Sequence, residues 1–139
     1  MSGTQKRIII VTGSRAWGDW SIVNDALLQA KPDEIWTGDA RGVDAIAARH
    51  ARLRGIALRT WPADWAQLGR AAGVLRSREM IDAAPPSAIV LAFARWPLSA
   101  SRGTAATVEF ATRRRLLAYH IDADGQRRCL STPRGGIQT

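Results

Sequence analysis

The sequence has little cysteine and little histidine. Cys129 is its one cysteine, and His50 and His120 are its two histidines. One cysteine excludes an intramolecular disulfide framework and a multi-cysteine zinc site, and two histidines argue against a histidine-rich metal site. No apolar run approaches the roughly 18 residues that suggest a membrane-spanning helix, and no signal peptide precedes the first strand-like run. We therefore expect a cytoplasmic protein without a metal site of its own.

Lysine is scarce as well, although the chain is basic. The net charge is +8, and all but Lys6 and Lys31 of the 20 basic residues are arginine. The arginine fork binds planar oxyanions well, and a basic field concentrates nucleic acid, so this composition favours a phosphate-bearing partner. A GC-rich genome would enrich arginine in the same way whatever the function. Charge alone leaves the two explanations open.

The chain alternates strand-like and helix-like segments. Its 139 residues suffice for one domain. Short β-branched or apolar runs, closed by glycine, proline or polar residues, predict strands; these are Lys6–Val11, Glu34–Thr37, Ile56–Trp61, Ala88–Phe93 and Tyr119–Ile121. Apolar periodicity and capping residues predict the helices between them; these are Ser21–Ala30, Val43–Arg54, Arg70–Ala83 and Thr104–Leu117.

This alternation is typical of right-handed βαβ units around a parallel sheet. We expect the α/β class, with a single three-layer Rossmann-like domain over residues 1–121. Its sheet would be mostly parallel, with about five strands and helices on both faces. Residues 122–139, which hold the turn Asp124-Gly125, would form a C-terminal hairpin arm or a flexible tail.

Glycine, hydroxyl and arginine residues follow several of the predicted strands. Gly13, Ser14 and Arg15 come after the first, Gly42 opens the helix after the second, and Gly103-Thr104 opens the helix after the fourth. Ligands of open parallel sheets bind at the carboxyl ends of the strands, and helix N-termini favour anions. Each loop alone could be only a tight turn. Three of them on one edge favour a phosphate site.

Most of the tryptophans lie in or beside the same loops. An exposed tryptophan next to a phosphate site can stack on a nucleobase. Trp17, Trp65 and Trp96 are the candidates for this role. Trp36 and Trp61 lie within predicted strands, where packing in the core is the simpler interpretation.

Few carboxylates accompany these loops. Asp44 lies in the first turn of its helix, where capping would account for it, and Asp64 could bind a ribose hydroxyl. Glu79 lies next to Arg78 and three residues after Arg76, a spacing typical of an ion pair within one helix.

Five motifs in order resemble one known family. They are Thr12-Gly13-Ser14-Arg15, Gly38-x-Ala40-Arg41-Gly42-x-Asp44, Pro62-Ala63-Asp64-Trp65, Gly69-x-x-x-Gly73 with Arg76-x-x-x-Met80, and Arg102-Gly103-Thr104. Together they resemble the YspA/YpsA-like branch of the SLOG superfamily, small Rossmann-like proteins of bacteria and phages. The resemblance implies a nucleotide or nucleotide derivative bound at the strand carboxyl edge. It adds five residues to the expected ligand contacts: Gly38, Ala40, Arg41, Asp44 and Arg78, which is next to Glu79 in the sequence.

Two distant relatives imply further activities. The lysine-decarboxylase-like phosphoribohydrolases, which cleave the N-glycosidic bond of nucleoside 5′-monophosphates, carry an Arg-Lys-x-x-Met helix that Arg76 to Met80 resembles. Arg76 would then be catalytic, with Glu79 as a partner. Thr107 occupies the position of that family's glutamate, so Asp44, Asp64 or Glu79 would have to replace it. The DNA-processing A family has similar loops and binds single-stranded DNA.

The sequence thus predicts a module that binds a nucleotide-derived ligand as a sensor or a sequestering protein. Alternatives are the phosphoribohydrolase reaction and single-stranded nucleic-acid binding. No cofactor is firmly implied, although a phosphate ligand could bring Mg²⁺ with it. Relatives are often dimers, which leaves a homodimer open.

Overall fold

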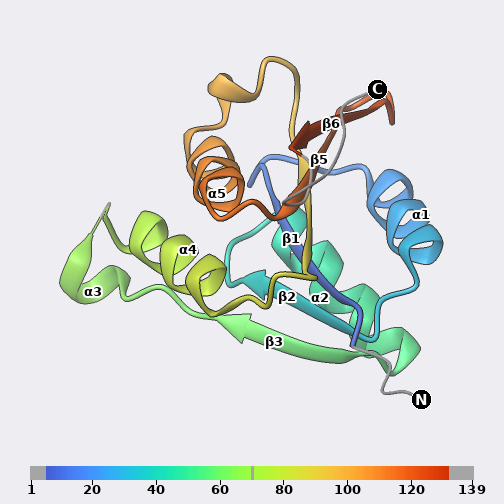
Figure 1. Ribbon diagram of the computed structural model, residues 1–139, viewed down its shortest axis with the longest axis horizontal. Coiled ribbons are helices and arrows are strands. Elements are labelled where there is room, and N and C mark those ends of the chain that lie inside the picture. Colours follow the sequence, from blue (N-terminus) through green and yellow to red (C-terminus); the bar gives the residue numbers. More distant parts are fainter. Residues whose placement is uncertain (1–5, 70, 132–139) are drawn as a thin grey trace.

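The computed structural model describes residues 6–69 and 71–131 (Figure 1). In chain order the elements are β1 Ile8–Gly13, α1 Trp20–Ala30, β2 Glu34–Gly38, α2 Val43–Arg54, β3 Ala57–Trp61, α3 Trp65–Leu68, α4 Ala71–Ala83, β4 Ile89–Phe93, the 3-10 turn η1 Leu98–Ala100, α5 Arg102–Arg113, β5 Leu117–Ile121 and β6 Arg127–Ser131. Within this part of the chain, no helix is long and apolar enough to cross a membrane.

The strands form one sheet in the order β3-β2-β1-β4-β5-β6. All neighbouring pairs are parallel except β5 and β6, which are antiparallel. The α/β class and the mostly parallel sheet are confirmed, with six strands instead of about five. The sixth, β6, lies in the segment 122–139, of which residues 132–139 fall outside the described residues. From β1 the chain first adds β2 and β3 on one side and then adds β4 and β5 on the other, so the strand order reverses between β1 and β4. Open sheets of this kind bind ligands at such a point.

Helices cover both faces of the sheet, which gives three layers (Figure 1). Strand β1 shows how the sequence produces these layers, because successive side chains of a strand point to opposite faces of the sheet. Ile9 and Val11 pack into a core with α1 and α2, whereas Ile8 and Ile10 pack into a second core with α4 and residues of α5. Helices α4 and α5 contact each other over that second face.

The ends of two helices show where local sequence was sufficient. The Asp19 side chain caps α1 by accepting hydrogen bonds from the backbone N–H groups of Ser21 and Ile22. Gly55 ends α2 in the left-handed conformation, at φ 66°, as glycine does after a helix. Helix α5 is different: it stops at Arg113, four residues before the predicted end, because Arg115 turns into the left-handed region at φ 59°. No glycine or proline lies near Arg113 in the sequence to predict this helix end.

Candidate functional site

A pocket of about 620 Å³ opens at the carboxyl ends of β1 and β2, beside the start of α5. Its wall comes from the loop after β1, the start of α2, the α3–α4 segment and the first turns of α5. The residues are Thr12, Gly13, Ser14, Arg15, Ala16, Ala40, Asp44, Trp65, Gly73, Val74, Arg76, Ser77, Ala100, Ser101, Arg102, Gly103, Thr104 and Thr107. The volume lies in the usual range for small-molecule sites, roughly 300–1,000 Å³.

The loop after β1 is held against the start of α2. A Cβ atom at Gly13 would lie 2.5 Å from both the carbonyl oxygen of Phe93 and Cγ2 of Val43, so only glycine fits between β4 and α2. A Cβ atom at Gly42, where φ is 70°, would come within 2.6 Å of the carbonyl oxygens of both Ser14 and Arg15. These two glycines are needed for packing whether or not a ligand is present. They fix the positions of Ser14 and Arg15 at the pocket.

The first turn of α5 supplies the polar end of the pocket. Residues Ser101 to Thr104 line it, and the Ser101 side chain makes no capping hydrogen bond. First-turn N–H groups lack partners within the helix, and the helix dipole favours negative charge there. Gly103 faces open space, because a Cβ built on it would have no atom within 4 Å apart from those of its own turn of helix. An anion can therefore approach this turn closely.

Trp65 forms an aromatic wall. Its side chain is 40% exposed, and the Arg15 guanidinium lies 4.8 Å from the centre of its ring. Gly73 of α4 backs the indole, because a Cβ there would lie 3.1 Å from the Cη2 atom. The pocket therefore places an aromatic surface, on which a base can stack, next to a cationic group that can bind a phosphate.

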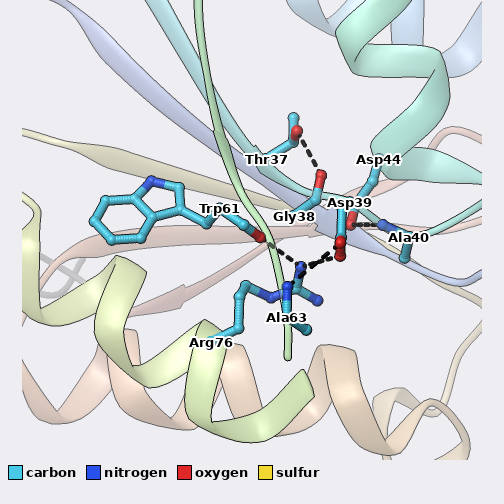
Figure 2. A network of polar contacts seen from close by, with 8 residues as sticks. All are labelled: Thr37, Gly38, Asp39, Ala40, Asp44, Trp61, Ala63 and Arg76. Carbon is cyan, nitrogen blue, oxygen red and sulfur yellow. Dashed lines mark hydrogen bonds and ion pairs between the residues drawn. The ribbon is translucent and has the colours of Figure 1, made fainter. Parts of the chain in front are cut away.

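Arg76 connects α4 with the loop after β2 and with the end of β3, at the base of the pocket (Figure 2). Its Nη1 donates to Oδ1 of Asp39, after β2, at 3.2 Å and to the carbonyl oxygen of Trp61, at the end of β3, at 3.0 Å. Asp39 in turn accepts a hydrogen bond from the backbone of Ala63 through its second oxygen. Within residues 6–69 and 71–131 the buried Nε of Arg76 has no partner. The predicted ion pair with Glu79 on the same helix is wrong, because Arg76 reaches across to Asp39.

Among the described residues that line the pocket, Asp44 is the one carboxylate, and it is buried. Its Oδ2 accepts a hydrogen bond of 3.2 Å from the backbone of Ala40. Burial raises its pKa to about 6, and the charge of Arg76 and the Ala40 hydrogen bond oppose that rise only in part. A carboxyl group that titrates near neutral pH inside a cleft is a common feature of functional sites.

The structure brings together nine of the predicted site residues: Gly13, Ser14, Arg15, Ala40, Asp44, Trp65, Arg76, Gly103 and Thr104. Gly38 lies just beneath them, against the Arg76 guanidinium and the Asp44 carboxylate. Gly42 acts through the packing described above. Arg41 is exposed and does not line the pocket.

Several other predicted residues lie elsewhere. Trp17 is a core residue, 8% exposed, which packs edge-on against Phe93 and donates from its indole nitrogen to the Asp19 carbonyl oxygen at 2.7 Å. Asp64 caps α3 by accepting from the backbone of Gln67. Arg78 and Glu79 are on the exposed side of α4, where Arg78 lies 4.0 Å from Asp82. Trp96 packs against His120 and Arg128, away from the pocket.

Sequence reasoning missed three residues that matter to the geometry. Asp39 anchors Arg76, and its only signal was its place in the loop after β2. Ser101, in the loop after β4, and Arg102, the first residue of α5, also line the pocket. Arg102 was quoted only as part of a family motif, and neither residue was expected to contact the ligand. A position at or just after the carboxyl edge of the sheet was the signal available for all three.

Comparisons with known proteins identify the family of this chain. Residues 7–67 match the sequence profile of the YspA, cpYpsA-related SLOG family. The "Gene 61 protein" of Mycobacterium phage D29 is 41% identical, over 70% of this chain and 82% of its own length. The chain belongs to the YspA, cpYpsA-related SLOG family. Membership in this SLOG family indicates a small-molecule ligand related to nucleotides. The profile match ends before α4, so it includes the loops after β1 and β2 but neither Arg76 nor the α5 turn.

Proposed function

We propose that this SLOG protein binds a nucleotide or nucleotide-derived ligand in the pocket and acts as a sensor or sequestering module. The observation that carries the proposal is one cavity with an anion-favouring helix start at one end and an exposed indole on its wall. The phosphate would contact the first turn of α5, near Gly103 and Thr104, together with Ser14 and Arg15. The base would stack on Trp65.

Asp44 supports the sugar part of this assignment. A carboxylate on the same pocket wall can accept hydrogen bonds from ribose hydroxyls, which a bare phosphate or a free base does not offer. Within residues 6–69 and 71–131, the backbone N–H of Ala40 donates a hydrogen bond to its Oδ2, and its Oδ1 accepts none. Asp44 takes over the role that the sequence had suggested for Asp64, whose side chain caps α3.

The test is a titration of the full chain with ribonucleoside 5′-monophosphates, the matching nucleosides and inorganic phosphate, followed by calorimetry. Native mass spectrometry of the freshly purified protein would also identify any small molecule that it retains. We expect a monophosphate to bind more tightly than its nucleoside. Arg15→Ala should weaken that binding by about tenfold or more, the range of a charge-assisted hydrogen bond.

Arg41→Ala is the matched control. It removes the same charge from a neighbouring loop, and its side chain is exposed and outside the pocket. We expect it to change affinity little. Equal losses from both variants would mean that general charge drives binding. If no nucleotide binds and the purified protein carries none, the proposal is wrong.

A second candidate is hydrolysis of the N-glycosidic bond of a nucleoside 5′-monophosphate. It is favoured by the presence of Asp44 and Arg76 on one pocket wall, because the carboxylate could stabilise an oxocarbenium-like centre in place of the missing glutamate. Glu79 is exposed and outside the pocket, so it has no part in this candidate. Release of free base that Asp44→Asn abolishes would support hydrolysis. Binding of the monophosphate without release of free base would mean that the protein binds its ligand and does not hydrolyse it.

A further inference from the structure

A second cavity lies between α1 and α2. It measures about 370 Å³ and shares no residue with the pocket at the strand ends. Trp20 and Asn24 of α1 line it, together with Ile46, Arg49, His50, Leu53 and Arg54 of α2. Helices α1 and α2 pack on the sheet face opposite α4 and α5, so this cavity lies on the α1–α2 face of the sheet.

The charged residues that line this cavity are basic. They are Arg49 and Arg54, and no carboxylate among the described residues lines it. Among the ion pairs of residues 6–69 and 71–131, neither arginine takes part. Two uncompensated guanidinium groups beside one hollow favour an anionic occupant, and the net charge of +8 strengthens that preference.

The apolar part of the cavity is aromatic and exposed. Trp20 is 46% exposed, and the Arg49 guanidinium lies 4.7 Å from the centre of its ring. Leu53 is also largely exposed at the rim. An exposed indole paired with an arginine is the arrangement on which unpaired bases stack in proteins that bind single strands.

The buried side of the cavity has an unsatisfied polar atom. His50 is 4% exposed, and its Nδ1 lies 2.9 Å from Oδ1 of Asn24. Among the described residues its buried Nε2 has no partner. Leaving such an atom unpaired is unfavourable, and a ligand with hydrogen-bonding edges could supply the partner that the protein lacks.

We propose that this cavity binds single-stranded nucleic acid, with phosphates against Arg49 and Arg54 and an unpaired base at Trp20. A nucleic-acid strand satisfies all three features, since it carries anionic groups, flat aromatic faces and hydrogen-bonding edges. An acidic polypeptide would engage the two arginines but would leave the indole and the cavity without a matching group. The proposal is independent of the nucleotide pocket because the two cavities share no residue.

The test uses fluorescence anisotropy of a labelled single-stranded oligonucleotide titrated with the full chain at low and moderate salt. We expect Arg49→Gln and Arg54→Gln each to weaken binding several-fold and to reduce the slope of log affinity against log salt by roughly 0.7. Trp20→Ala should weaken it by about tenfold or more, the range of one stacked base. A duplex of the same length should bind less tightly, because its bases are already stacked.

Arg113→Gln is the matched control. It removes one positive charge from a side chain that is 71% exposed on α5, on the opposite face of the sheet. An effect equal to that of Arg49→Gln would overturn the proposal in favour of uniform charge attraction. Unchanged affinity of Trp20→Ala, or competition by polyglutamate as strong as by an unlabelled strand, would overturn it too. So would absence of binding at low salt, or displacement of the strand by a saturating nucleoside monophosphate.

Discussion

The guanidinium group of Arg76 lies directly over the backbone of Gly38, so closely that a Cβ atom at Gly38 would overlap its Nη1. The same Cβ would come within 2.7 Å of Oδ2 of Asp44. Gly38 ends β2, and the missing side chain is the space through which Arg76 reaches Asp39 and Trp61. The floor of the pocket at the strand ends therefore depends on a glycine that does not line it.

Gly38→Ala should destabilise the protein. The added methyl group must displace the Arg76 side chain or the Asp44 carboxylate, and overpacking of this kind costs roughly 1–3 kcal/mol in free energy of unfolding. Urea denaturation measures the loss. Nucleotide affinity should fall as well, because both displaced side chains line the pocket.

Gly103→Ala is the informative contrast to Gly38→Ala. A Cβ there meets no atom within 4 Å apart from those of its own turn of helix, and the position is inside α5, where alanine is favoured over glycine by about 0.5–1 kcal/mol. We expect unchanged or raised stability together with weaker nucleotide binding, because the methyl group obstructs close approach to the helix start. Equal affinity of the variant and the natural chain would mean that no anion contacts this turn.

Arg76→Ala should lower the free energy of unfolding by about 1–3 kcal/mol, since it removes two hydrogen bonds, one of them to a carboxylate. Arg78→Ala, two residues later on α4, should change little because its side chain is 67% exposed and lies 4.0 Å from Asp82. Chemical denaturation of the two variants side by side measures this difference. Similar losses in both would show that the contacts of Arg76 with β2 and β3 do not stabilise the fold.

The two tryptophans that sequence analysis treated alike should behave differently. Trp17→Leu removes a buried indole that packs against Phe93, and large core residues cost several kcal/mol when truncated. Trp65→Leu changes a half-exposed side chain and should leave stability nearly unchanged while weakening nucleotide binding about tenfold. Thermal unfolding and calorimetric titration of each variant measure the two effects. Loss of affinity in Trp17→Leu at full stability would contradict this assignment.

The sequence predicted the fold well because the relevant signals are local. The unbroken β-branched run of β1, Asp19 before α1 and Gly55 after α2 are local features of the sequence, and in the structure they give a buried strand, an N-cap and a left-handed helix end. The end of α5 was misjudged because Arg115, which has no special tolerance for positive φ, adopts that conformation where the chain turns into β5. Tertiary packing, not local preference, decides that turn.

The pocket was harder to predict because the position of a residue in the sequence does not show which way its side chain points. Trp17 follows a site loop, yet its side chain turns back into the core, whereas Trp65 on a short helix faces the pocket. Arg76 is three residues from Glu79 but reaches Asp39 on another element. The loops at the strand ends could be placed by topology, but the side chains that meet across them depend on how α3 and α4 pack against the sheet.

Asp44 should make stability fall as pH rises. Its pKa is raised from 3.8 to about 6 in the native state, so between these values the folded protein binds a proton that the unfolded chain does not. This stabilisation is fully present below the unfolded pKa of 3.8 and is lost as pH rises through the native pKa of about 6. Asp44→Asn cannot ionise, and its advantage over the natural chain should grow across this window to at most ~3 kcal/mol.

Asp122→Asn should show the opposite sign and serves as the control. Hydrogen bonds from the Arg128 side chain and from the backbone of Gln126 and Asp124 lower the pKa of Asp122. Its contribution is therefore present at neutral pH and is lost as pH falls through the native pKa. Urea denaturation of the natural chain and the two variants at about pH 2.5, 4, 5.5 and 7.5 should show two separate windows: the difference for Asp44→Asn grows between about pH 4 and 7, and that for Asp122→Asn changes only below about pH 4. An Asp44→Asn difference that stays constant between about pH 4 and 7.5 would mean that Asp44 is ionised in the folded protein throughout that range, and that its burial is relieved by water or by Arg76.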